Sequence, residues 1–311
     1  MRRLFCVNSA YFVLKLFAEI HAAKFFKTQI LPQNFAFVKI KAVWFTLNHQ
    51  LAKKGGKMEW HSTYAAIYRA KKDELKPVVE LDEVSLSDLL GIESQKEALL
   101  ANTKSFLEGK GFHHALLWGA RGTGKSSLIK ATFNEFKERN LRLVQIDKAD
   151  LNALTEIIDE LRELPFKFII FCDDLSFEKG DEAYKFLKPL LEGSIEKTPA
   201  NIVLYATSNR RHLLAEFDSD NDNASFEDGE LHLGDVKEEK LSLSDRFGLW
   251  ISFYAENLEH YLKIVDFYFK DFRGKKELLH DKAKEFARFR ASHSARIARQ
   301  FYLSFKDEFK A

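Results

Sequence analysis

The stretch Gly119-Ala120-Arg121-Gly122-Thr123-Gly124-Lys125-Ser126 fits the phosphate-binding loop pattern G-x-x-x-x-G-K-[ST] without a gap. Its glycines allow the backbone to take positive φ and to approach a phosphate closely. Successive N–H groups would then surround an anion at the N-terminus of a helix, whose dipole favours negative charge. Lys125 is expected to reach the β- and γ-phosphates, and Ser126 to supply one Mg²⁺ ligand. The predicted nucleotide-binding set is this stretch together with Ser127.

The residues on either side of the loop match the setting that the pattern requires. Residues 114–118 are expected to form a buried strand, and residues 127–139 a helix. The alternative is a glycine-rich turn that opens an ordinary helix, and the strand–loop–helix order argues against it. The sequence therefore predicts a site for a nucleoside triphosphate.

Composition bounds the class of protein. The 311 residues are 46% hydrophobic and 30% charged, which is typical of a globular chain with one large or two modest domains. Cys6 and Cys172 have no metal-binding or redox spacing, so a reducing cytoplasm is the expected location. Residues 1–57 carry ten Lys and Arg against one acid, whereas the remaining chain carries 38 against 45. This mildly acidic remainder disfavours a large electrostatic footprint on nucleic acid.

Residues 1–57 form a basic, aromatic extension. Lys15 interrupts their apolar run, so neither a signal peptide nor a membrane-spanning helix is expected. A segment lying on a membrane surface is one interpretation. The other is that the native chain begins at Met58, because codons for Lys54-Gly55-Gly56-Lys57 can contain AGGAGG, a ribosome-binding sequence, just upstream.

The segment from Met58 to residue 88 is interpreted as an arm, loosely helical over residues 60–76. A helix is expected over residues 94–108, with Ser94 as its N-cap and Glu97 completing a capping box. The apolar residues just before it would either staple this helix to the core or cover an adenine; they are Leu89, Leu90 and Ile92.

Strands alternate with helices after the loop. Strands are expected over residues 141–146, 166–172, 202–207 and 249–253, and helices over 151–164 and 184–191. This order predicts an α/β fold of the P-loop NTPase type, with a three-layer parallel sheet whose ligand lies at the carboxyl ends of the strands. The predicted domains are a core over residues 89–254 and a helical lid over 255–311, with lid helices at 257–272, 276–290 and 293–305.

Two predicted strands end in polar side chains. The apolar run over residues 168–172 ends in Asp173-Asp174, which is typical of a Walker B element. Asp173 would hold Mg²⁺, and Asp174 would orient or deprotonate the attacking water. The next strand ends in Thr207-Ser208-Asn209, of which Asn209 is expected to help place the water, with Thr207 and Ser208 as alternatives. The structural alternative for both strands is a plain turn.

Four stretches together resemble AAA+ ATPases, and more closely an uncharacterised bacterial AAA+ family, one of the domain-of-unknown-function groups. They are LLWGARGTGKSS (116–127), FCDDLSF (171–177), YATSNRRHLL (205–214) and LSLSDRFGLW (241–250). The similarity covers about residues 89–301. It implies an ATPase core with an α-helical lid, and it implies no known substrate. The function we expect is that of an oligomeric ATPase that binds ATP and Mg²⁺ and couples nucleotide state to remodelling or regulating a protein partner.

The resemblance also implies roles for two arginines. Arg246 would act as an arginine finger on the γ-phosphate bound to the next subunit, unless it pairs with a local acid such as Asp245. Arg296 would sense the γ-phosphate from the lid of the same subunit, with Arg299 as the less favoured candidate. Walker B ends here in Asp-Asp, whereas many AAA+ motors have Asp-Glu. The departure allows a slow ATP-binding switch or nucleic-acid loader of the replication-initiator type, with basic lid residues 282–299 on DNA, as the alternative function.

Residues 216–239 hold ten Asp and Glu against one Lys. Their charge repulsion and low hydrophobicity predict a mobile acidic loop inside the core.

Overall fold

The computed structural model describes residues 58–177, 181–193, 195–211, 213, 225–227, 230–232, 245–254 and 257–309. The chain divides into two compact units, Met1–Met58 and Glu59–Ala311, and every described helix and strand belongs to the second. The predictions for residues 1–57 lie outside the described residues, as does most of the acidic segment 216–239. Within that segment a short antiparallel pair is described, β7 (Ser225–Glu227) with β8 (Glu230–His232).

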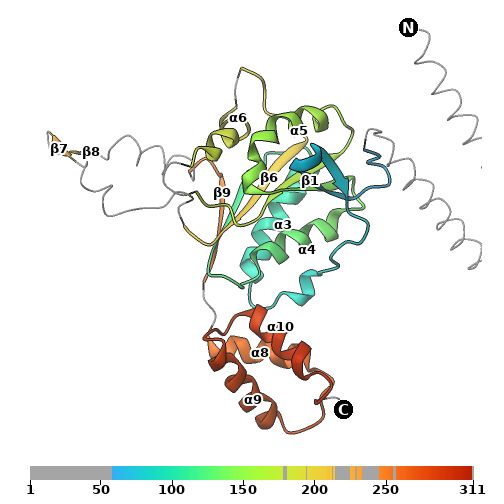
Figure 1. Ribbon diagram of the computed structural model, residues 1–311, viewed down its shortest axis with the longest axis vertical. Coiled ribbons are helices and arrows are strands. Elements are labelled where there is room, and N and C mark those ends of the chain that lie inside the picture. The colour runs from blue at the N-terminus through green and yellow to red at the C-terminus, as the bar shows by residue number, and fades with distance from the viewer. Residues whose placement is uncertain are drawn as a thin grey trace, which may run out of the picture. The chain divides into compact units, whose positions relative to one another are not determined.

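A seven-stranded sheet organises the described part of this unit, in the order β2-β1-β4-β5-β6-β3-β9 (Figure 1). All neighbours are parallel except β1 and β2. The strands are β1 (Ala65–Arg69), β2 (Glu74–Pro77), β3 (Ala115–Gly119), β4 (Leu141–Ile146), β5 (Lys167–Cys172), β6 (Ile202–Ser208) and β9 (Leu249–Phe253). The predicted α/β sheet is confirmed, and its central strands are buried on both faces because helices cover both.

Alternate residues of the strands contact different helices. One face packs against α3 (Glu93–Leu107) and α4 (Lys125–Phe136), with Leu117, Ile169 and Tyr205 among the buried strand residues. Helices α5 (Leu154–Leu161) and α6 (Lys188–Glu192) lie on the other side in Figure 1. Each is preceded by a 3₁₀ segment, η3 (Lys148–Ala153) and η4 (Ala183–Leu187), so each predicted helix is in part a tighter turn.

The helical interpretation of residues 60–76 is wrong. These residues form the β1–β2 hairpin around η1 (Ala70–Lys72), and β1 extends the sheet by pairing with β4. Arg142 anchors this segment: its Nε donates to the Trp60 carbonyl at 2.8 Å, and its guanidinium lies 4.8 and 4.5 Å from the rings of Tyr64 and Phe166. The segment folds as a strand because β4 supplies hydrogen-bond partners that residues 60–76 alone cannot.

The predicted N-cap of the next helix is also wrong. Helix α3 begins at Glu93 with Ile92 in the cap position and no side-chain cap bond, while the Ser94 hydroxyl donates to Gln95 Oε1 at 2.9 Å. Ile92 is buried in the core at 7% exposure, so the cap position holds an apolar contact in place of a side-chain cap. Just before it, η2 (Leu86–Asp88) has the capping box, formed by Ser85 and Asp88.

The apolar residues before α3 pack against the rest of the protein. Leu89 and Ile92 pack with the core and Leu90 with the lid, which fits the interpretation that they staple the helix in place. Their role in covering an adenine stays a prediction.

The lid contains three described helices, α8 (Leu258–Tyr268), α9 (Lys276–Phe289) and α10 (Ala295–Phe305). They enclose a core of their own that includes Tyr261, Phe269 and Phe301. The Tyr261 hydroxyl donates to the Ala283 carbonyl at 3.0 Å and so joins α8 to α9.

His114 directly precedes β3, which spans Ala115–Gly119 and thus begins one residue later than the predicted strand 114–118. Its Nδ1 accepts a hydrogen bond from the Leu204 backbone N–H at 3.0 Å, and burial lowers the pKa of its imidazole from 6.5 to about 4. The unfolded chain therefore binds a proton at a higher pH than the folded chain does. We expect the free energy of unfolding to fall as the pH decreases from 6.5 towards 4, by up to about 3 kcal/mol from this group.

Denaturant unfolding at pH 7 and pH 4.5 measures this effect. His114→Gln should lose stability at pH 7 and show a shallower pH dependence than the wild type, whereas His61→Gln, at an exposed site, should leave the pH dependence unchanged. Equal slopes for His114→Gln and the wild type would contradict the assignment.

Candidate nucleotide-binding and hydrolysis site

The predicted phosphate loop connects β3 to α4 in an open, positive-φ conformation. Gly119 has φ of 132°, and a Cβ there would lie 1.9 Å from the Phe253 carbonyl oxygen, so no side chain fits. Gly122 also has positive φ, at 79°. The Ala120 N–H donates to the Phe253 carbonyl at 3.0 Å, which ties the loop to the end of β9.

The backbone N–H groups of the loop are available to a ligand. Within the described part of the chain, none of the N–H groups of residues 121–127 has a hydrogen-bond acceptor. They stand at the N-terminus of α4, where the helix dipole adds positive potential. Free N–H groups at a helix N-terminus suit a bound anion such as a phosphate group, and we call this set of N–H groups the cradle.

Lys125 lies beneath this cradle at 7% exposure. Its Nζ donates to the carbonyls of Gly119 at 2.8 Å and Ala120 at 2.7 Å and to Asn209 Oδ1 at 3.1 Å. Burial lowers the pKa of the ammonium from 10.5 to about 8, against the opposing attraction of Asp174 and Asp173. The ammonium is thus partly desolvated beside the loop.

The two carboxylates of the predicted Walker B element bind different partners. Ser126 Oγ donates to Asp173 Oδ1 at 2.6 Å. Asn209 Nδ2 donates to Asp174 Oδ1 at 2.6 Å, so a continuous chain of hydrogen bonds runs from Lys125 through Asn209 to Asp174. The hydroxyl and carboxylate oxygens of Ser126 and Asp173 are the hard ligands that Mg²⁺ prefers, and they lie close enough to share one ion.

Sequence reasoning missed the connection between β6 and the Asp173-Asp174 pair. Thr207 Oγ1 donates to Asp173 Oδ1 at 2.6 Å and accepts from the Asp174 N–H at 2.9 Å. Thr207 is an alternative to Asn209 for placing water in the sequence analysis, but its hydroxyl bonds to the Asp173 carboxylate and to the Asp174 backbone N–H. In the sequence, this role is indicated only by the position of Thr207, two residues before Asn209 at the end of the strand.

Arg296 approaches the loop from the lid. A Cβ built at Gly122 would lie 3.4 Å from the Arg296 Cβ and 2.8 Å from the Ser294 Oγ. The charge of Arg296 also lowers the pKa of Lys125. Arg299 lies near Tyr268 instead. Burial raises the pKa of the Tyr268 hydroxyl, and the charge of Arg299 opposes that rise. Of the two candidate arginines, Arg296 in the first turn of α10 is therefore the one that lies near the loop.

Arg246 lies away from the loop of its own chain. It precedes β9, whose first residue pairs with Ala115 at the start of β3, whereas the loop follows the other end of that five-residue strand, about 16 Å away. Its Nε contacts Glu192 Oε1 at 3.1 Å, and its buried Nη1 has no hydrogen-bond partner in the described structure. The local acid is thus Glu192, which sequence reasoning did not single out.

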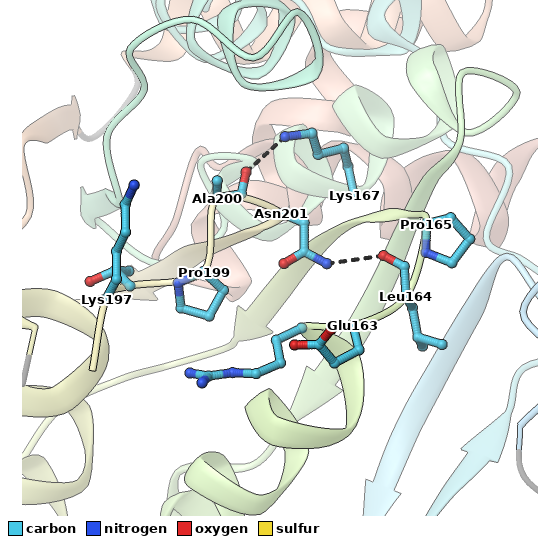
Figure 2. A pocket seen from close by; sticks show the side chains of 10 residues that line it. Glu163, Leu164, Pro165, Lys167, Lys197, Pro199, Ala200 and Asn201 are labelled. Carbon is cyan, nitrogen blue, oxygen red and sulfur yellow. Dashed lines mark hydrogen bonds between the residues drawn. The ribbon is translucent and has the colours of Figure 1, made fainter.

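Two cavities lie away from the phosphate loop and the residues around it. One, of about 490 Å³, lies at the amino ends of β5 and β6, where Lys167 donates to the Ala200 carbonyl at 2.7 Å and Asn201 to the Leu164 carbonyl at 3.3 Å (Figure 2). The other, of about 510 Å³, is lined by α3, α4 and η2. Neither contains a predicted site residue.

The described residues hold no group of three or more His, Cys, Asp and Glu side chains that could hold a metal ion. None of the described helices combines the length and apolar character needed to cross a membrane.

Solved structures give a weak likeness. RuvB of Thermotoga maritima, described as a Holliday junction branch migration motor, is 16% identical with a TM-score of 0.39, over 71% of this chain and 72% of that chain. Two substituted forms of RuvB are 15% and 16% identical, each with a TM-score of 0.40, over 71% and 73% of this chain and 72% and 74% of theirs. These scores carry no argument about function, and no curated protein matches the chain.

The family comparison is decisive for membership. A family model described as "Protein of unknown function (DUF815)" matches residues 61–309. The match extends beyond residues 89–301 in both directions and includes the β1–β2 hairpin, in agreement with its place in the sheet. The chain, with its mostly parallel sheet and three C-terminal helices, therefore belongs to the DUF815 family.

Proposed function

We propose that this protein is an ATPase that binds Mg–ATP at the β3–α4 loop and hydrolyses it with help from a second copy. The observation that carries the proposal is the hydrogen-bond chain from Lys125 through Asn209 to Asp174, beside the pair of Ser126 and Asp173. In P-loop ATPases these residue types hold the phosphates, the metal ion and the attacking water.

Each predicted residue has a role in this proposal. Residues 119–127 bind the phosphates, and Ser126 and Asp173 hold Mg²⁺, which neutralises phosphate charge when bound. Asp174 accepts a proton from the attacking water or orients it, and Asn209 helps place that water. Arg296 would contact the γ-phosphate from the lid.

Self-association is part of the proposal because Arg246 cannot serve the loop of its own chain. It lies at the opposite end of β3 from the loop, and an arginine supplied from a neighbour would stabilise charge on the transferring phosphoryl group. The neighbour would have to draw the guanidinium away from Glu192. Nucleotide state would then be coupled to the assembly and, through it, to a protein partner in the cytoplasm.

The alternative, a replication-initiator-type switch or nucleic-acid loader, has less support. Of its basic lid residues, Lys282 pairs with Glu308, and Lys284 pairs with Asp281 at 3.1 Å. This pairing reduces the positive charge available to DNA.

Mixing two inactive variants tests the shared site. Lys125→Ala should lose nucleotide binding, and Arg246→Ala should bind nucleotide but hydrolyse it about 10³-fold more slowly. A 1:1 mixture should regain about a quarter of wild-type activity, since one interface in four combines an intact loop with an intact Arg246. Wild-type specific activity should also rise with protein concentration. Absence of rescue, together with dilution-independent activity, would refute trans catalysis.

A further inference from the structure

Thr207 connects the neighbouring strand to the Asp173 carboxylate and to the backbone of Asp174. It is the penultimate residue of β6 and only 2% exposed. It pairs with Leu117 of the P-loop strand, while the last paired residue of β5 opposite β6 is Cys172, just before Asp173. The sheet therefore places Thr207 beside the point where the chain leaves β5.

Three bonds connect Thr207 to three consecutive residues. Its hydroxyl donates to Asp173 Oδ1 at 2.6 Å and accepts from the Asp174 N–H at 2.9 Å. Its carbonyl accepts from the Leu175 N–H at 2.7 Å. A hydroxyl has one proton and two lone pairs, so a threonine can make both side-chain bonds at once.

These bonds hold an unusual backbone conformation. Asp174 has φ of 53°, in the left-handed region that residues other than Gly, Asn and Asp seldom enter. The turn directs the Asp174 carboxylate to Asn209, and the bond to the Asp174 N–H fixes that turn. The proton of the Thr207 hydroxyl is already committed to Asp173, so the hydroxyl does not serve the attacking water.

We propose that Thr207 is a positioning residue, which fixes Asp173 for the metal ion and Asp174 for the water. The inference rests on the proposed function and names a residue on which the geometry of that site depends. Threonine suits the position because branching at Cβ restricts χ1 and keeps the hydroxyl aimed at both partners. Valine has the same shape but would leave Asp173 without this donor and the Asp174 N–H without an acceptor.

The test compares Thr207→Val with Thr207→Ser, which keeps the hydroxyl. The readouts are the affinity for a fluorescent ATP analogue in EDTA and across a Mg²⁺ titration, kcat and KM for ATP, and the melting temperature. For Thr207→Val we expect the Mg²⁺ concentration at half-effect to rise about 10-fold and kcat to fall about 10- to 100-fold. Affinity in EDTA should stay within about 3-fold of wild type, and Thr207→Ser should approach wild type in every readout.

Thr103→Val is the matched control, because Thr103 is also fully buried and its hydroxyl bonds to the Leu99 carbonyl and the Tyr205 hydroxyl. It should lower the melting temperature without altering the Mg²⁺ response. A Thr207→Val protein with the same pattern, or with wild-type Mg²⁺ response and kcat, overturns the positioning role alone. If the wild type binds nucleotide with Mg²⁺ but does not hydrolyse it, only the proposed hydrolysis fails and the titration still decides on Thr207. A wild type without Mg²⁺-dependent nucleotide binding overturns both.

Discussion

Asp174→Asn is expected to stop hydrolysis while leaving ATP bound. The amide can still accept the hydrogen bond from Asn209 Nδ2 at the place of Oδ1, so the local geometry should persist. It carries no negative charge and accepts a proton poorly, so we expect kcat to fall by about 10²- to 10⁴-fold. Single-turnover assays with radiolabelled ATP measure the hydrolysis step, and filter binding measures retention. Because ATP would stay bound, this variant should also capture a protein partner in its ATP-bound complex.

Two further substitutions make the result specific to Asp174. Asp159→Asn, at an exposed carboxylate 3.5 Å from Arg162, should leave kcat unchanged. Asp174→Glu restores the Asp-Glu pair of many AAA+ motors and should retain turnover. Asp174→Asn activity within a few-fold of wild type would remove Asp174 from the proposed chemistry.

Lys125→Met should weaken ATP binding by about 100-fold or more. The substitution removes the charged donor nearest the phosphate cradle, and charge-assisted hydrogen bonds of this kind contribute about 1.5–3 kcal/mol each. The buried methionine keeps most of the volume of the side chain, so the fold should survive. Calorimetric titration with ATP and Mg²⁺ gives the affinity directly. Lys130→Met is the control, because Lys130 lies on the same helix and pairs with Asp82 at 3.0 Å.

The lowered pKa of Lys125 adds a pH signature to this experiment. Because that pKa is about 8 in the free protein, the ammonium loses its proton as the pH rises through 8, and binding a phosphate must then recover it. Wild-type affinity for ATP should therefore decline above pH 8, while the residual affinity of Lys125→Met should not follow this decline. Parallel pH profiles for both proteins would exclude Lys125 as the titrating group.

The parts of the fold that sequence predicted well are those coded by contiguous residues. The buried runs of β3 to β6 and β9 are short, apolar and punctuated by helices, so each strand could be recognised without knowledge of its neighbours. The β1–β2 hairpin could not, because its stability depends on pairing with β4 and on Arg142, more than sixty residues away. A local pattern of aromatic and charged residues was mistaken for a helix there.

The site shows the same division. Parallel strands deliver their carboxyl ends to one edge of a sheet, so the proximity of Lys125, Asp173 and Asn209 follows from strand order alone. The bonds made by Thr207 depend on the left-handed turn at Asp174, and the contact of Arg246 with Glu192 depends on how α6 ends. The spacing of residues along the sequence predicts neither the Thr207 bonds nor the Arg246–Glu192 contact.

The absence of a side chain at Gly122 also allows the loop to pack closely against the start of α10. The space that a Cβ would fill at Gly122 is taken by Ser294, with its Cβ only 2.9 Å from that position. The loop and the lid therefore pack closely here, and any side chain at position 122 would collide with Ser294. If the loop shifts when it binds a phosphate, the shift would act directly on Ser294, the N-cap residue of α10.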